Sequence, residues 1–200
     1  TFGFINALAN STFGEGDSIE GGAGKDTIQI GVNGNAQRYD ISETELRNKK
    51  SVDVVDLRGG NINNLSLSSD FVAASDSGNR MEVRTDRVVQ TSATDSNNPT
   101  GGLFNALENG ATNTVRLTQL TSSQGVDFFG GSGSDRIILN DATFNVLQKL
   151  DGGVYNDAAL IGLGRADTVT VVTNGENVVI DAQDLSNVKN VEAFVLTKNS

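Results

Sequence analysis

Short apolar runs recur along the chain, and several of them alternate with polar residues. Val169 and Val171, for example, stand two apart among threonines, which is the period of a half-buried strand. Pairs of glycine or asparagine, which favour turns, separate the runs. The pattern predicts an all-β chain. We expect strands over residues 27–30, 52–57, 62–67, 80–84, 114–120, 136–139, 168–172, 177–180 and 191–196.

Helical signals are few and short. Ser42 and Glu45 have the spacing of a capping box, in which a hydroxyl and a carboxylate bind the free amides of a helix start. Asp141 precedes a second expected helix over 142–150, which Gly152 would end. The sequence therefore predicts two short helices between strands.

One internal repeat is informative about organisation. Residues 41–57 align without a gap on residues 180–196, and Ile, Leu, Asn, Lys, Val and Leu coincide at the matching positions. Such a repeat is typical of a solenoid that reuses one strand–turn–helix–strand unit. We expect a first segment over 1–99 and a second over 100–200, and the alternative of one continuous solenoid stays open.

Composition narrows the chemistry. The chain has no cysteine, histidine or tryptophan, and 15 basic against 25 acidic residues give a net charge of −10. Disulfides, thiolate or imidazole catalysis and the usual zinc and copper sites are excluded. The charge argues against nucleic acid and anionic membranes as partners and favours divalent cations. No apolar run approaches the ~20 residues of a membrane helix, so we expect no transmembrane segment.

Two segments carry the pattern Gly-Gly-x-Gly-x-Asp-x-apolar-x. They are residues 21–29 and 130–138. Glycines permit a tight turn that exposes carbonyl oxygens, and the aspartate adds a hard anionic oxygen, while the apolar residue turns into the core. Because Ca²⁺ takes about six to eight oxygen ligands, one turn supplies only half a site, and a neighbouring turn must complete it.

On these residues the sequence resembles the haemolysin-type (RTX) calcium-binding proteins, most of all bacterial surface-layer proteins and large type I-secreted adhesins. The resemblance implies calcium as the bound ion, with loops near 14–29 and 125–138. The glycine turns and the flanking segments suggest the ligands; residues 13–19 resemble a nonapeptide one residue short, and residues 151–157 a degenerate third copy. The implied ligands are Asp17, Gly22, Gly24, Asp26, Asp127, Gly131, Gly133, Asp135 and Asp157.

The resemblance also implies an architecture and a role. The expected fold is a parallel β-solenoid, β-roll-like, with short helical turns and Gly/Asp-rich calcium loops. The expected function is a calcium-stabilised structural module, without enzyme activity, of a bacterial extracellular surface layer or cell-surface assembly. Its partners would be further copies of itself and surface polysaccharide. Two alternatives are an adhesin or carbohydrate-binding module, and the non-catalytic tail of a type I-secreted enzyme. Since the chain begins with Thr1, we expect a processed form or a piece of a longer protein.

Two other segments have a functional interpretation. A phosphate-binding loop at residues 19–26 is rejected, because Ile19 and Asp26 stand where that motif needs glycine and a hydroxyl. Arg80, Arg84 and Arg87 lie on a strand-like segment. They form either a basic patch for an anionic polysaccharide or, as we favour, a solvated face that balances nearby acidic residues.

Overall fold

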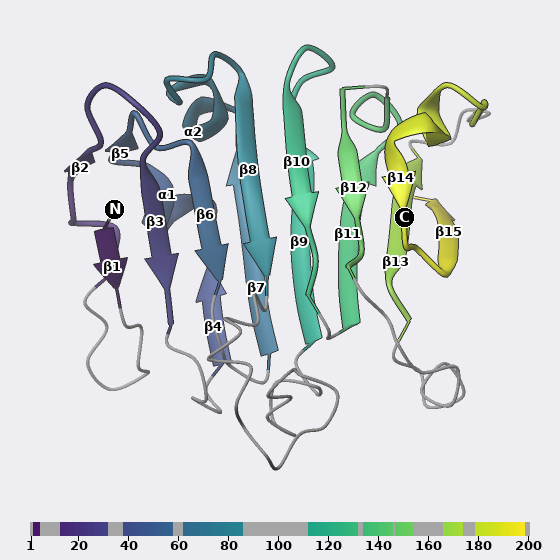
Figure 1. The fold of residues 1–200 in the computed structure, drawn as a ribbon, viewed down its shortest axis with the longest axis horizontal. Coiled ribbons are helices and arrows are strands. Elements are labelled where there is room, and N and C mark those ends of the chain that lie inside the picture. Colours follow the sequence, from purple (N-terminus) through teal and green to yellow (C-terminus); the bar gives the residue numbers. More distant parts are fainter. Residues whose placement is uncertain are drawn as a thin grey trace, which may run out of the picture.

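The structure is a computed structural model, and its strands form two large parallel sheets and one small one (Figure 1). It describes residues 2–4, 13–31, 38–57, 62–85, 112–131, 134–145, 147–153, 166–173 and 179–198. Every strand pair is parallel. The expectation of an all-β chain is therefore confirmed.

The elements are as follows. The seven-stranded sheet contains, in spatial order, β1 (Phe2–Phe4), β3 (Thr27–Ile30), β6 (Val54–Leu57), β8 (Arg80–Thr85), β10 (Gly125–Phe129), β12 (Lys149–Asp151) and β14 (Val188–Lys189). The six-stranded sheet contains β15 (Ala193–Lys198), β13 (Thr168–Thr173), β11 (Ser134–Asn140), β9 (Thr112–Gln119), β7 (Ile62–Ser68) and β4 (Arg38–Ile41). The small sheet pairs β2 (Ile19–Glu20) with β5 (Lys49–Lys50), and the helical elements are α1 (Glu43–Leu46), α2 (Ser69–Ala73) and the 3-10 turn η2 (Asp184–Asn187).

From β3 onward the chain alternates between the two large sheets. Each strand of the seven-stranded sheet is followed by one of the six-stranded sheet, and each return adds the next strand beside the previous one. The two sheets lie face to face, with the first strands near the N-terminus and the last near the C-terminus (Figure 1). We call one strand of each large sheet, with the segments that join them, a passage of the chain. Segments at equivalent places in successive passages therefore stack on one another.

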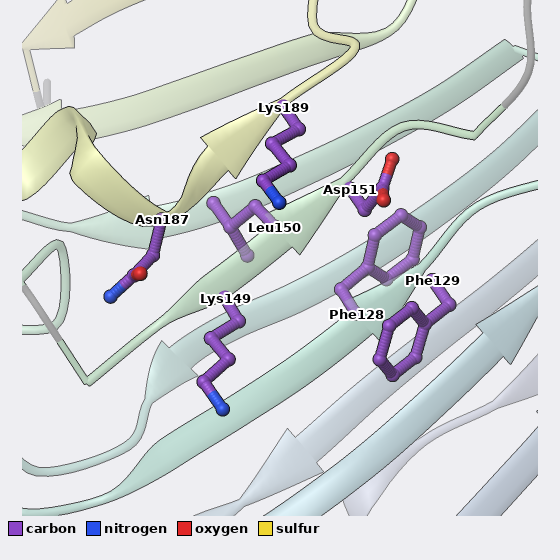
Figure 2. Close-up of a pocket in the computed structure, with 7 residues that line it drawn as sticks. All are labelled: Phe128, Phe129, Lys149, Leu150, Asp151, Asn187 and Lys189. Carbon is purple, nitrogen blue, oxygen red and sulfur yellow. The ribbon is translucent and has the colours of Figure 1, made fainter.

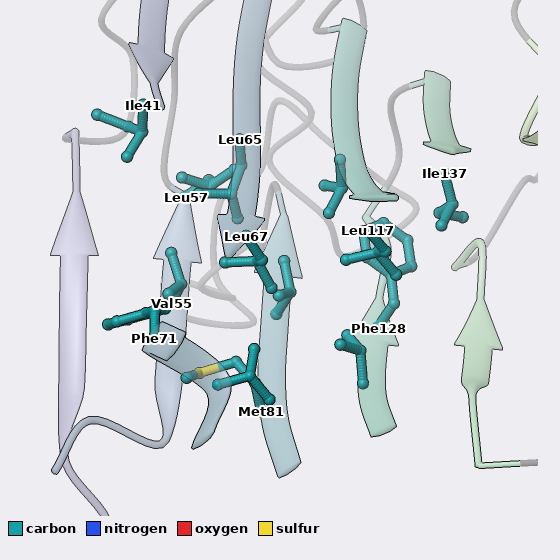
Figure 3. Packing of buried hydrophobic residues seen from close by; sticks show 14 of the residues in the cluster. Ile41, Val55, Leu57, Leu65, Leu67, Phe71, Met81, Leu117, Phe128 and Ile137 are labelled. Carbon is teal, nitrogen blue, oxygen red and sulfur yellow. The ribbon is translucent and has the colours of Figure 1, made fainter. Parts of the chain in front are cut away.

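The core lies between the two sheets. In β8 the side chains of Met81 and Val83 are buried, whereas Arg80, Glu82 and Arg84 point to the outer face, as the two-residue period of a strand requires. Apolar side chains from both sheets meet in the space between them (Figure 3). The labelled examples are Ile41, Val55, Leu57, Leu65, Leu67, Phe71, Met81, Leu117, Phe128 and Ile137.

The capping box at Ser42 is confirmed at the start of α1. The expected helix over 142–150 is wrong: residues 141–143 form one turn, and β12 begins at residue 149. The amide of Asn140 donates to Oγ1 of Thr143 at 3.0 Å, and the amide of Thr143 donates to Oδ1 of Asn140 at 2.8 Å. These local hydrogen bonds close a turn in place of a continuing helix. The expected strand over 177–180 is also not formed at its last two residues. No helix in the described part of the chain has the length and apolar character needed to cross a membrane.

Candidate functional site

The repeated segments 41–57 and 180–196 have the same local order of elements, although the first leads from the small sheet to the seven-stranded sheet and the second from the seven-stranded to the six-stranded sheet. Each has a short helical element, a two-residue strand and then a longer strand. Between the two strands, Ser51 and Asn190 stand at matching positions and have φ values of 50° and 51°. The repeat seen in the sequence is therefore a repeated corner of the backbone. We call residues 20–26 and 50–53 the first corner, and residues 129–131, 134–135, 151–153, 166–167 and 189–192 the second corner.

Close stacking of backbone explains the first glycine of each motif. A Cβ atom on Gly21 would lie 1.9 Å from the carbonyl oxygen of Ser51. The same atom on Gly130 would lie 2.1 Å from the carbonyl oxygen of Gly152, and on Gly152 it would lie 2.1 Å from that of Asn190. Only glycine fits where successive passages approach this closely. These glycines are thus required by the stacking itself.

The acidic residue of each motif belongs to a ladder of amides and carboxylates. The amide of Asp26 donates to Oδ2 of Asp53 at 3.0 Å. In the second corner, the amide of Asp135 donates to Oδ1 of Asp167 at 2.7 Å, and that of Asp167 donates to Oε2 of Glu192 at 2.8 Å. Each carboxylate therefore binds the amide of the equivalent acidic residue in the preceding passage.

The first corner is electrostatically balanced. Asp53 is buried, and burial acts to raise its pKa. Hydrogen bonds from the Asp26 amide and from the amide and hydroxyl of Ser77, together with the charge of Lys25, outweigh that effect and hold the pKa of Asp53 below its usual value. This corner satisfies its buried carboxylate with groups of the chain.

The predicted ligands of the first motif lie around this corner. Gly22 and Gly24 are exposed and have φ values of 81° and 108°, so both use backbone conformations that favour glycine. Asp26 is half-buried, and its carbonyl oxygen accepts the amides of Asp53 and Val54. That carbonyl is therefore already engaged in the stacking of the two passages.

Asp17 lies in the preceding turn, where a lysine holds the carbonyl oxygens. The carboxylate of Asp17 is exposed and accepts the Gly14 amide at 2.7 Å. Nζ of the buried Lys49 donates to the carbonyl oxygens of Gly14 and Asp17, at 2.7 and 2.6 Å, and lies 4.9 Å from the centre of the Phe13 ring. The internal ammonium thus takes backbone oxygens of the kind that a calcium loop offers to a metal ion.

The second corner differs from the first because its buried carboxylates repel one another. Asp135 is 1% exposed, and its Oδ1 accepts Oγ1 of Thr85 at 3.0 Å and Nδ2 of Asn113 at 2.8 Å. Its Oδ2 is also buried and meets no donor at hydrogen-bond geometry within the described residues, although the Gly131 amide acts to lower the pKa. Burial outweighs these donors and raises the pKa of Asp135 to about 6.

Asp167 is the more strongly perturbed member of this corner. It is also buried, and burial followed by the charge of Asp135 raises its pKa to about 8. Glu192 and Asp151 act in the same direction. Within the described residues, neither Asp135 nor Asp167 forms an ion pair with lysine or arginine. Four acidic residues thus influence this corner, and the two buried ones have no basic partner among the residues that the structure describes.

The remaining predicted ligands are Asp127, Gly131, Gly133 and Asp157. Asp127, on β10, is bound by Arg80 and has Nζ of Lys149 at 4.0 Å, so it is not held by the glycine turn. Gly131 adjoins Asp135, as expected, whereas Gly133 and Asp157 lie outside the described residues. Among the residues described, no three acidic side chains are grouped as a complete metal site. A calcium ion would therefore need backbone oxygens as well.

Sequence reasoning missed three residues of the ladder: Asp53, Asp167 and Glu192. The signal for two of them was present, because the internal repeat aligns Asp53 with Glu192. Asp167 stands before Thr168 and Val169, just as Asp26 stands before Thr27 and Ile28. The insertion between Gly153 and residue 166 conceals this third copy of the motif in the sequence.

The arginines predicted to form a solvated face do pair with acids. Arg80 binds Asp127, and Arg84 binds Glu82. Lys25 from the first corner reaches the same Glu82. These pairs agree with a balanced outer face, and Arg87 lies outside the described residues.

The outer face of the seven-stranded sheet carries two clefts that share Phe129. One, of about 120 Å³, is lined by aromatic, lysine and polar side chains from β10, β12, η2 and β14 (Figure 2). The other, of about 320 Å³, lies toward β8 and is lined by Glu82, Arg84, Thr85 and Gly130 besides Phe129. The Phe129 ring is 44% exposed, so it offers an apolar surface among charged groups.

Comparison of the chain with protein-family models, with curated proteins and with solved structures gave no match.

Proposed function

We propose that this chain is a calcium-stabilised structural module of a bacterial extracellular surface layer or cell-surface assembly. The observation that carries the proposal is the second corner, where the buried Asp135 and Asp167 lie close together without a basic partner among the described residues. Burying such charge is costly unless a cation or a proton compensates it. The glycine motif there supplies the turn that resembles the RTX calcium loop.

The finer architecture that we propose is a parallel β-solenoid. Strands alternate between two parallel sheets, and each passage adds one strand to each sheet. The matched corners at Ser51 and Asn190, with the same left-handed φ, support a repeating coil. In such a solenoid each coil contacts only its neighbours, so a corner that remains unstable weakens the stack at that point.

The donor set at the second corner fits a calcium ion better than that at the first. Asp135 and Asp167 are oxygen ligands, and Oδ2 of Asp135 is buried without a well-aligned donor within the described residues. Calcium bound there would supply two positive charges to this acidic corner. Asp135 would keep its bonds to Thr85 and Asn113, while Asp167 would keep the Asp135 amide, so the chain itself fixes both carboxylates.

The role that follows is architectural. When a bound calcium ion neutralises the carboxylates of Asp135 and Asp167, the corner between β10 and β11 is stable and the passages stack. Calcium at the millimolar concentrations found outside cells then stabilises the folded chain by mass action, and a calcium-poor cytoplasm would leave it less stable and easier to secrete.

The direct test is thermal unfolding, followed by circular dichroism, in EGTA and then across a calcium titration, with magnesium as the competing ion. We expect calcium to raise the unfolding temperature of the chain. Asp135→Asn should abolish most of that rise, whereas Asp26→Asn at the first corner should preserve it. An unfolding temperature that calcium leaves unchanged would overturn the proposal.

The alternative of a carbohydrate-binding module has one specific observation in its favour. Phe129 is exposed between two clefts that carry Arg84 and Glu82 on one side and Lys149 and Asp151 on the other. An apolar ring among polar groups is a surface on which sugar rings stack. Affinity electrophoresis in gels containing an acidic or a neutral polysaccharide, with Phe129→Ser as the variant, tests it; unchanged mobility of the native chain in both gels excludes this function for those polysaccharides.

A further inference from the structure

The C-terminal end of the structure exposes apolar side chains that its internal twin buries. Because 180–196 repeats 41–57, each position can be compared with a partner. Leu46 is fully buried, whereas its counterpart Leu185 is 40% exposed. Leu57 is 1% exposed, whereas Leu196 is 58% exposed.

The strand β15 shows the same contrast along its length. Phe194 corresponds to the fully buried Val55 and is 42% exposed, although its ring packs edge-on against Phe144 at 6.2 Å. Val195, which faces the other way, is exposed as well. In the segment 41–57, the strand β6 pairs on its C-terminal side of the stack with the next strand, β8. Among the described strands, β15 pairs only with β13, the strand before it. We call Val179, Leu185, Phe194, Val195 and Leu196 the end patch.

The end patch is a concentrated feature. It holds five of the seven exposed large apolar side chains in the described part of the chain. The last strands β14 and β15 lie at this end of both sheets (Figure 1). An apolar face beside an open strand edge favours association.

The opposite end is closed where it is described. Phe13, Ile19, Tyr39 and Ile41 are all buried there. Among the described side chains of this end, a head-to-tail copy would therefore find little exposed apolar surface to bury. A two-fold arrangement brings the end patch against itself, so that both open ends are covered at once.

The charges on β15 favour the same arrangement. Glu192 precedes the strand and Lys198 is its last residue, and both are exposed. A two-fold axis through the middle of β15 sets the strand antiparallel to its copy. Each Lys198 then lies near the Glu192 end of the other strand, and Leu196 lies near the axis.

We propose that the end patch docks on the end patch of a second copy of this chain, with β15 pairing antiparallel to its symmetry mate. The interface needs no metal ion. Failure of the dimer proposal is therefore distinguishable from failure of the calcium proposal, because association of the chain is measured separately in EGTA and in calcium.

Sedimentation velocity over a range of concentrations tests the proposal. We expect the chain to form a dimer in either solution, and Leu196→Lys to raise the dissociation constant at least tenfold. Leu147→Lys, a substitution of another exposed leucine outside the end patch, is the matched control and should leave the dimer intact. A chain that stays monomeric throughout overturns the proposal, as does a dimer that Leu196→Lys does not weaken.

A mixing experiment tests the two-fold axis itself. Leu196→Lys and Leu196→Glu chains should each be largely monomeric, and their equimolar mixture should form a heterodimer, because residue 196 lies close to residue 196 of the copy. Circular dichroism of each variant confirms that it is folded, and Lys198→Glu, at an exposed position, provides a second weakening variant. If the mixture remains monomeric while the native chain dimerises, the two-fold arrangement is wrong.

Discussion

The carboxylate of Asp167 accepts the backbone amide of Asp135 at 2.7 Å, and both side chains are buried. This bond ties two successive passages of the chain together at the second glycine corner. It also places the Asp167 charge where the Asp135 charge opposes it. The corner is therefore stable only when a proton or a cation neutralises the negative charge of the two carboxylates.

Asp167→Asn separates these two effects. An amide oxygen can still accept the Asp135 amide, but the cost of burying an ionisable acid, which must stay protonated or carry an unfavourable charge, is gone. In EGTA near neutral pH we expect the variant to be more stable than the native chain, by about 1–3 kcal/mol. In calcium the order should reverse, because the variant lacks a charged ligand. Urea unfolding in both solutions measures this, and a variant that is less stable in EGTA would indicate that the charge itself is not a burden.

The pH dependence of the metal-free chain follows from the same pair. Burial raises the pKa of Asp135 to about 6 and, with the charge of Asp135, that of Asp167 to about 8, from an ordinary 3.8. The folded state therefore holds these protons more tightly than the unfolded state. Their contribution to stability is complete below the ordinary value and is lost as the pH rises through about 6 and then 8.

We expect the urea midpoint in EGTA to fall between about pH 4 and pH 8, and the part of this fall above about pH 6 to be much smaller in Asp167→Asn. Calcium should flatten the slope in the native chain, because it compensates the ionised forms. A metal-free midpoint that instead rises across this interval would contradict the assignment of raised pKa values to the corner.

Gly152 tests the stacking independently of any metal ion. A Cβ atom there would lie 2.1 Å from the carbonyl oxygen of Asn190 and 2.6 Å from Oδ2 of Asp167. Gly152→Ala should therefore destabilise the chain by about 1–3 kcal/mol, through displacement of the neighbouring passage. The control is Gly16→Ala, where the new Cβ atom has no neighbour within 4 Å. Equal unfolding midpoints for the two variants would show that the passages are not so closely packed.

Periodicity and the glycine motifs were sufficient to predict the parts of the fold that depend on neighbouring residues. The alternation of Met81 and Val83 with charged residues is a local pattern, and the repeat of 41–57 in 180–196 marks two corners with the same local backbone. The expected helix after Asp141 failed because Asn140 and Thr143 close a turn there. Local pattern could not decide between these competing hydrogen bonds.

The environment of each aspartate depended instead on partners distant in sequence. Asp135 is bound by Thr85 and Asn113, which stand 50 and 22 residues away. The carbonyl oxygens of the Asp17 turn are held by Lys49, 32 residues later than Asp17. The motif therefore identified the acidic residues, but only the stacking of passages decides which of them are balanced.

Lys49 provides the last test, since it performs at the first turn the role that a metal ion would have in a calcium loop. Its ammonium group binds the carbonyl oxygens of Gly14 and Asp17 and lies over the Phe13 ring. Burial lowers the pKa of Lys49, while the charges of Asp17 and Glu45 act to raise it, so burial makes the ammonium charge less favourable than it would be in water.

Lys49→Met fills the same space but leaves the two carbonyl oxygens without their donor. We expect a loss of about 1–3 kcal/mol of stability, measured by urea unfolding. Lys50→Met, at the exposed neighbouring position, should change stability by less than about 0.5 kcal/mol. Calcium should stabilise the Lys49→Met variant by no more than it stabilises the native chain. The turn at Asp17 offers a metal ion one exposed carboxylate and no buried acid. A calcium response larger than that of the native chain would instead show that the ammonium group and the metal ion compete for the same oxygens.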